Sequence, residues 1–242
     1  METLNLNRLT IPVEGERNKS LDDFSIHLAN PKFETIEAIF KNQEKRLLEI
    51  ISSFEKGAIF GCIAWLTSKS ILKALAKCET VQIIVQKEDF LRPDLDTKNV
   101  ELWKVQLWKL YKAINCKMER HQFREPMGNL SVFSDPTVEG IRCVGNHNQE
   151  RKAAFPRAHH KFLVFCELDQ NENYSPVALW TGSFNFTQNA SNSFENVLYL
   201  VDKAGNNEII NAYLKEHHQI FSLSEQLNWS ERWAAPQHRI GT

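Results

Sequence analysis

Residues 58–89, AIFGCIAWLTSKSILKALAKCETVQIIVQKED, decide the fold. The run at 58–67 is apolar throughout, as in a strand that is buried on both faces, and the run at 80–89 has the same character. Between them, a serine can cap a short helix that continues to Ala76. A strand, a helix and a second buried strand indicate an α/β domain with right-handed crossovers.

The same alternation continues on both sides of this segment. Upstream, residues 33–40 are a strand candidate, and residues 42–54 place apolar side chains on one side at helical spacing. Downstream, residues 98–118 carry an apolar stripe with the period of a helix. The other expected elements are strands at 140–144, 159–168, 177–186 and 196–201, of which the second and third form a hairpin, and a closing helix at 207–221.

The pattern favours one domain. The 242 residues contain no internal repeat and no low-complexity linker. We expect a loose arm at 1–23, a globular domain at 24–225 with a helical insert at about 90–145, and a tail at 226–242.

Composition excludes several classes of protein. The chain is 42% hydrophobic and 24% charged, which excludes a disordered, collagen-like or coiled-coil protein. Its 29 Lys and Arg nearly balance its 30 Asp and Glu, so no overall positive charge attracts phosphates. Any nucleic-acid binding must therefore come from a local basic patch.

The five cysteines, at 62, 78, 116, 143 and 166, lie in or beside apolar runs. They show no CxxC or CxH spacing, so we expect reduced thiols and neither a metal site nor a redox pair. The first 20 residues lack the apolar core of a secretory signal, and no stretch of about 18 apolar residues occurs. These features favour a cytoplasmic protein without stable membrane association.

The residues that carry chemistry lie between His159 and Glu195. His159 and Lys161 stand two apart at the start of an apolar strand, so their side chains share a face, whereas His160 points to the other face. After the hairpin follows GSFN at 182–185. An imidazole, an ammonium group and neutral hydrogen-bond donors suit a phosphate oxyanion.

These residues resemble the HKD signature of the phospholipase D superfamily. The likeness rests on His159 and Lys161, on GSFNFT at 182–187 and on the acidic Glu195 before the next strand, and it is strongest over 155–201. The match is to the short form that carries one copy of the signature per chain. The resemblance implies a mixed sheet flanked by helices on both faces, in a single domain that acts as a homodimer.

One position departs from the family pattern. The family has an Asp five residues after the Lys, and this chain has Cys166 there. By strand alternation Cys166 faces away from Lys161, and Glu167 shares the Lys161 face unless a bulge intervenes. The family's Asp is a supporting residue, so its loss need not abolish activity.

The resemblance also implies a mechanism that needs neither metal nor cofactor. One histidine attacks phosphorus to give a phosphohistidine, and a second protonates the leaving oxygen. His159 is the candidate nucleophile, and Glu195 is the candidate for orienting its ring. Lys161, Asn185 and Ser183 would bind the phosphate and offset its charge.

That mechanism needs two histidine–lysine pairs, and this chain holds one. The other histidines, at 27, 121, 147, 160, 217, 218 and 238, are not followed by a lysine two residues on. A homodimer with the site on its two-fold axis supplies the second pair. We therefore expect a dimer whose single active centre uses His159 twice.

Two kinds of phosphodiester compete as substrate. For nucleic acid, with DNA favoured and RNA a second candidate, the segment RKAAFPRAHHK at 151–161 gathers charge beside the nucleophile. There Arg151, Lys152 and Arg157 would contact phosphates, and Phe155 would stack on a base. These residues favour a nuclease.

Two alternatives stay open at this stage. Trp103, Trp108 and Tyr111 in the 98–118 segment would meet a lipid surface if the enzyme were a phospholipase. Cys166 leaves room for a third class, an inactive HKD-like scaffold. The joint presence of His159, Lys161, Asn185 and Glu195 argues against a scaffold.

Overall fold

The computed structural model describes residues 32–88, 102–116, 121–125, 128–132, 139–145, 157–168 and 173–227; for 121–125 and 128–132 it describes the backbone alone. The arm expected at 1–23 lies outside these ranges, as do Arg151, Lys152 and Phe155.

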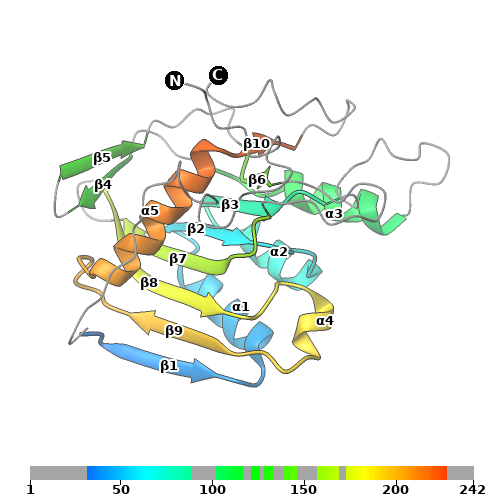
Figure 1. Cartoon of the computed structure of the whole chain (residues 1–242), viewed down its shortest axis with the longest axis horizontal. Coiled ribbons are helices and arrows are strands. Elements are labelled where there is room, and N and C mark those ends of the chain that lie inside the picture. Colours follow the sequence, from blue (N-terminus) through cyan, green and yellow to red (C-terminus); the bar gives the residue numbers. More distant parts are fainter. Residues whose placement is uncertain are drawn as a thin grey trace, which may run out of the picture.

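A mixed β-sheet forms the centre of the molecule, and its buried strands are the apolar runs of the sequence. Strands β2 and β3 pair in parallel, as expected for two strands joined by a helix, and β7 pairs antiparallel with β2 on the other side. The strand order is β1-β9-β8-β7-β2-β3-β6-β10, and β4 pairs with β5 and with β8 (Figure 1). The strands in the described ranges are β1 (Thr35–Ile39), β2 (Ala58–Ile63), β3 (Thr80–Gln86), β4 (His121–Glu125), β5 (Gly128–Val132), β6 (Ile141–Val144), β7 (Lys161–Leu168), β8 (Tyr174–Gly182), β9 (Val197–Val201) and β10 (Glu225–Gln226).

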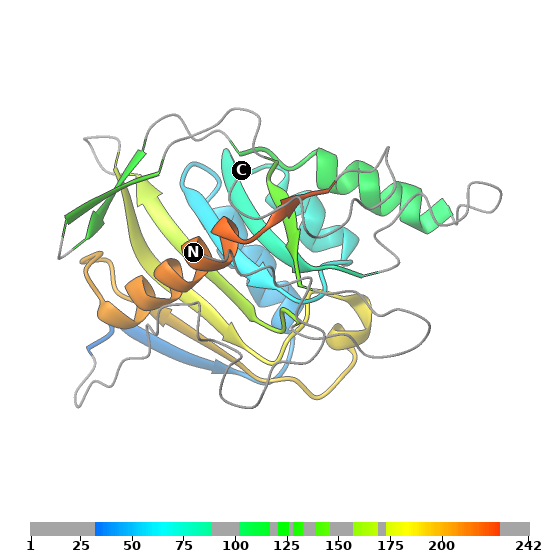
Figure 2. The same ribbon diagram turned by 45° about the horizontal axis from the view of Figure 1, so that its top comes forward.

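Helices cover both faces of the sheet, which confirms the predicted fold class. Helices α1 (Gln43–Ser53), α2 (Lys69–Leu75) and α3 (Leu102–Lys112) pack on one face, and α5 (Glu208–Ser222) crosses the other (Figures 1 and 2). Each face therefore has its own apolar core. Ser68 is the N-cap of α2, since its hydroxyl accepts a hydrogen bond from the backbone of Ile71.

The insert differs from the prediction. Helix α3 ends at Lys112, six residues before the expected end at 118. The reason is that residues 115–116 run beside β3, where the backbone of Val81 donates to Asn115. The hairpin of β4 and β5 was not expected from the sequence.

The apolar stripe of α3 belongs to the core along most of its length. Leu107, Tyr111 and Ile114 are buried, and Trp103 is exposed. The hydroxyl of Tyr111 donates to the carbonyl of Leu66 at 2.6 Å, so this side chain is anchored inside the protein. No helix in the described part of the chain is long and apolar enough to cross a membrane.

Two histidines of α5 make stability depend on pH. His217 is fully buried and His218 lies beside it, and both rings pack against Phe60. Burial lowers the pKa of His217 well below its usual value, and it lowers the pKa of His218 to about 4. Below about pH 6.5 the unfolded chain therefore binds protons that the folded chain does not.

We expect the free energy of unfolding to fall by about 1.4 kcal/mol per pH unit for each such histidine as pH drops from about 6.5 toward 4. Chemical denaturation at a series of pH values measures this slope. The variant His218→Gln has no imidazole to protonate. Its free energy of unfolding should therefore fall less steeply with decreasing pH, by about 1.4 kcal/mol per pH unit, which corresponds to one proton. An unchanged slope in the variant would contradict the assignment to His218.

Candidate active site

The candidate residues meet because three strand ends lie at one edge of the sheet. Strands β7 and β8 are antiparallel, so the start of β7 at Lys161 lies beside the end of β8 at Gly182. Gly182 in turn pairs with Val197, the first residue of β9. Segments far apart in sequence, namely 159–161, 182–185 and 195, are thus brought to one place (Figure 1).

The backbone that carries His159 is held on both sides. The side-chain oxygen of Gln86 accepts a hydrogen bond from the backbone of Ala158 at 2.6 Å, and the carbonyl of His160 accepts one from Ala64 at 2.8 Å. Gln86 is buried, so this support comes from the core. The His159 side chain itself is exposed and accessible to a substrate.

Lys161 places its ammonium group against the imidazole of His159. Its Nζ lies 3.2 Å from Nδ1 and 3.3 Å from Nε2 of the ring, and it donates to the carbonyl of His159 at 2.8 Å. The two side chains therefore share a face, as predicted. His160 points to the other face, where its Nε2 lies 3.4 Å from the carboxylate of Glu216 on α5.

Both groups of this pair have lowered pKa values. Partial loss of hydration is the largest cause of the lowered pKa of His159, followed by the charges of Lys161 and Arg157. A lowered pKa keeps the imidazole neutral, which is the form that a nucleophile requires. Burial also lowers the pKa of Lys161, and the carboxylate of Glu195 acts in the opposite direction.

The GSFN segment alternates between the core and the site. Phe184 and Phe186 are buried, whereas the intervening Ser183 and Asn185 are partly exposed. The aromatic side chains thus anchor the segment, and the polar ones face outward between them. The backbone of Phe186 donates to the carbonyl of Trp65 at 3.0 Å, which joins the segment to the chain after β2.

Gly182 is required by the close approach of two backbones. A Cβ at this position would lie 2.1 Å from the carbonyl oxygen of Asn196, which belongs to the chain entering β9. The backbone of Ser183 donates to that same oxygen at 2.9 Å. A side chain at Gly182 would push Ser183 and Glu195 apart.

Glu195 contacts Ser183. The hydroxyl of Ser183 donates to the Glu195 carboxylate and accepts from the backbone of Asn196 at 3.0 Å. The carbonyl of Glu195 accepts from the buried side chain of Gln43 at 2.9 Å. Ser183 therefore holds the carboxylate in place. Among the described residues, Glu195 makes no hydrogen bond to His159.

Arg157 forms an ion pair with Glu88 beside the site. The same carboxylate accepts a hydrogen bond from the indole of Trp65 at 3.0 Å. Of the four residues expected to contact nucleic acid, Arg157 is the one that the structure places. It adds charge near His159 while it anchors Glu88.

Cys166 follows the predicted alternation. It is buried in the apolar cluster on the α5 face, together with Phe162 and Val164, and burial raises the pKa of its thiol. The register with β8 shifts between Phe165 and Cys166, but the pairing of β7 with β2 stays regular. Glu167 lies at the far end of β7, away from Lys161.

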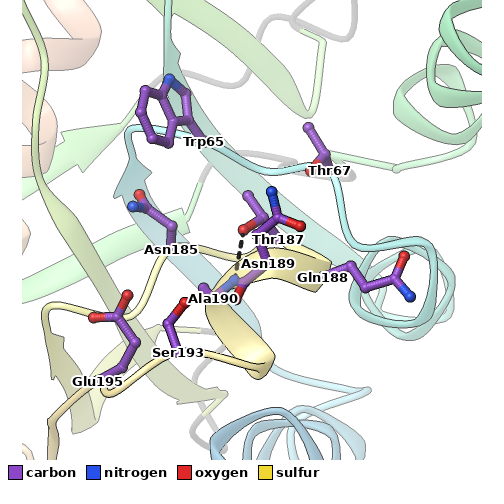
Figure 3. Close-up of a pocket in the computed structure, with 9 residues that line it drawn as sticks. All are labelled: Trp65, Thr67, Asn185, Thr187, Gln188, Asn189, Ala190, Ser193 and Glu195. Carbon is purple, nitrogen blue, oxygen red and sulfur yellow. Dashed lines mark hydrogen bonds between the residues drawn. The ribbon is translucent and has the colours of Figure 1, made fainter.

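A pocket of about 380 Å³ opens beside these residues. In Figure 3, Asn185 lies between Trp65 and Glu195 on one side of it. The other lining residues are Thr67, Thr187, Gln188, Asn189, Ala190 and Ser193, which come from the chain after β2 and from helix α4 (Gln188–Ser191) with its flanks. Among the described residues, no three His, Cys, Asp or Glu side chains form a group that could hold a metal ion.

Sequence reasoning missed Trp65, Glu88 and the polar residues around α4. Trp65 lies inside an apolar run, which predicted a buried strand residue. Strand β2 ends at Ile63, however, and the indole is 40% exposed. The one available signal for the residues around α4 was the order Thr187, Gln188, Asn189, because a capping residue followed by two amides indicates the polar start of a helix.

A viral protein is similar to this chain in sequence. The chain is 31% identical over 206 residues to the Acanthamoeba polyphaga mimivirus protein named Uncharacterized protein L381; the match covers 81% of this chain and 68% of that protein. No protein-family model matches the chain.

The solved structures that resemble the chain include two bacterial proteins. One is Nuc from Salmonella typhimurium, a phospholipase D family member, at 16% identity and a TM-score of 0.47, covering 79% of this chain and 96% of that one. The other is NucT from Helicobacter pylori, at 16% identity and a TM-score of 0.49, covering 79% and 98%.

Proposed function

The chain belongs to the family of the mimivirus protein L381, and from its site we propose that it is a metal-independent phosphodiesterase that cleaves nucleic acid, with DNA favoured. The observation that carries the proposal is the contact of His159 with Lys161 at 3.2 Å, at the sheet edge that also holds Asn185 and Glu195. A neutral imidazole beside a fixed ammonium group suits attack on a phosphodiester.

The proposed reaction has two steps. The neutral imidazole of His159 attacks phosphorus, a P–N bond forms, and the P–O bond to the leaving group breaks as that oxygen takes a proton from a second, protonated histidine. Water then attacks the phosphohistidine and gives its proton to the second histidine. The P–N bond breaks, and a phosphomonoester is released.

The other residues offset charge in this scheme. Lys161 is buried and already beside the imidazole, so its ammonium group can receive a phosphoryl oxygen with little reorganisation. We assign the amide of Asn185, in the segment after β8, the same task, and Ser183 the task of holding Glu195. Glu195 is still proposed to orient the His159 ring, a role for which its carboxylate must reach that ring as well as Ser183.

Nucleic acid is favoured over phospholipid by the structure of α3. The lipid alternative needs Trp103, Trp108 and Tyr111 at a membrane interface, and Tyr111 is instead buried and bonded to Leu66. Arg157 places positive charge within the electrostatic reach of His159. A positive charge near the nucleophile is suited to a polyanionic substrate.

Activity should be found on nucleic acid and should survive chelation. Purified protein is incubated with labelled single-stranded DNA, duplex DNA, RNA and phosphatidylcholine vesicles, each with and without EDTA. We expect DNA cleavage with unchanged rates in EDTA, because the scheme uses no metal ion. Cleavage of lipid alone would indicate a phospholipase, and the absence of any turnover would favour a scaffold.

The active protein is proposed to be a homodimer. The second histidine of the scheme must come from a second copy, since the site holds one histidine–lysine pair. Phe194, next to Glu195 in the chain, is fully exposed. An exposed aromatic side chain next to a site residue is suited to contact with a second subunit.

Mixed dimers test whether one centre uses His159 twice. Wild-type and His159→Ala chains with different tags are co-expressed in equal amounts, and the three dimers are separated. A hybrid has one histidine and should be nearly inactive, so the mixture keeps about a quarter of full activity. If the two subunits act independently, the mixture would keep about half of full activity. Sedimentation of the active protein as a monomer would overturn the proposed dimer.

A further inference from the structure

The pocket beside Asn185 and Glu195 has a chemical character of its own. Its volume of about 380 Å³ lies near the lower end of the range for small-molecule sites, which is roughly 300–1,000 Å³. It adjoins the group that we assign to the phosphate, Asn185, and extends from there along α4 (Figure 3). Whatever part of a substrate lies next to the reacting phosphate would enter it.

The lining combines neutral polar groups with apolar surface. Side chains that carry an amide or a hydroxyl make up six of the nine described lining residues, and none of the nine is a lysine or arginine, but more of the lining surface is apolar than polar. Among the described lining residues, Glu195 is the single charged one, and it lies at one edge of the pocket (Figure 3). A second phosphate would find no cation among these residues.

Trp65 offers a flat aromatic surface in a fixed orientation. Its indole is 40% exposed, although its Nε1 donates to Glu88 at 3.0 Å and Glu88 is paired with Arg157. Its carbonyl accepts from the backbone of Phe186. An exposed ring that is held in place from behind loses little entropy when another ring stacks on it.

Asn185 leaves a hydrogen-bond acceptor unused. Its Oδ1 is buried and has no hydrogen-bond partner among the described residues. A buried acceptor without a donor is unfavourable, and a donor on the bound ligand that reached it would remove that cost. The pocket thus combines a stacking surface, neutral hydrogen-bonding groups and an acceptor that lacks a donor.

We propose that this pocket binds one nucleobase, next to the phosphate that is cleaved. The inference rests on the proposed nuclease function and adds to it a substrate class. A base inside a duplex is stacked and paired, so it reaches a pocket only when it is turned out of the helix. The protein therefore prefers single-stranded nucleic acid.

The test compares two single-stranded DNA oligonucleotides that differ at one residue. One strand is intact, and the other carries a tetrahydrofuran abasic residue at a central position. We expect wild-type cleavage beside the abasic residue to be about 10-fold slower than at the same phosphate of the intact strand, from the lost stacking. The corresponding duplex should be cut more slowly than the intact single strand.

Trp65→Ala is the informative variant, and Trp103→Ala is its matched control. Both replace an exposed tryptophan, and Trp103 lies on α3 outside the pocket. We expect Trp65→Ala to cut the intact strand about 10-fold more slowly and to lose the difference between the two strands. Trp103→Ala should keep both the rate and the difference.

These measurements distinguish failure of the proposed base pocket from failure of the proposed nuclease function. Equal cleavage of both strands by the wild type would overturn the base pocket and leave the nuclease standing. If neither strand is cleaved, binding of both strands to His159→Ala is measured by tryptophan fluorescence. Tighter binding of the intact strand would then support the pocket without the nuclease, and equal binding would overturn both. Turnover of phosphatidylcholine vesicles that depends on Trp65 would assign the pocket to a lipid headgroup.

Discussion

Replacing His159 with alanine is expected to lower kcat on single-stranded DNA by at least about 10³-fold, with substrate binding largely kept. The variant has no imidazole to form the phosphohistidine, whereas Lys161 and the pocket residues stay in place. The side chain is exposed, so its loss should leave the Tm nearly unchanged. Single-turnover cleavage and an electrophoretic binding assay measure the two effects separately.

His160→Ala is the matched control for this variant. His160 is the adjacent histidine, but it faces α5 and lies near Glu216 on the other side of the sheet. We expect the His160→Ala change to alter kcat less than about 3-fold. The contact of His160 with Glu216 is partly exposed, so its loss destabilises the fold only weakly. Equal losses in both variants would contradict the assignment of His159 as the nucleophile.

Replacing Lys161 with methionine is expected to lower kcat/KM by about 10²- to 10³-fold. Methionine fills the buried volume of the lysine stem without its charge, so the fold should be kept while the phosphoryl charge loses its nearest cation. The same change should raise the pKa of His159, because the charge of Lys161 is one cause of its lowered value. An NMR titration of the His159 ring measures that shift.

The control for Lys161→Met is Lys203→Met. Lys203 is an exposed lysine after β9, and it is not among the causes of the lowered pKa of His159. We expect this variant to leave both kcat/KM and the His159 titration unchanged. A Lys161→Met protein with normal activity and an unmoved His159 pKa would show that the 3.2 Å contact has no part in the reaction.

The motif residues could be predicted from sequence because each is set by local geometry. His159 and Lys161 share a face through strand alternation, and the same rule places Cys166 on the α5 side. In GSFN the alternation of aromatic and polar residues likewise separates the core from the site. These relations span a few residues and depend on the backbone alone.

The pocket could not be predicted in this way. Trp65 lies far from Asn185 in sequence, and both line the pocket because the ends of β2 and β8 lie at one edge of the sheet. The end of α3 was misplaced for a related reason, since the pairing of residues 115–116 with β3 overrides the helical pattern. The hydrogen bond from Ser183 to the Glu195 carboxylate also depends on the fold and could not be predicted from the sequence.

The sequence by itself determined that this is an α/β protein with buried parallel strands and a histidine–lysine pair on one strand face, because hydrophobic periodicity and strand alternation act over short distances. Only the tertiary structure decided that Trp65 stands exposed beside Asn185, that Arg157 pairs with Glu88, and that Glu195 rests on Ser183. Those contacts depend on strand order and register, which bring distant segments together and leave no mark in the local pattern.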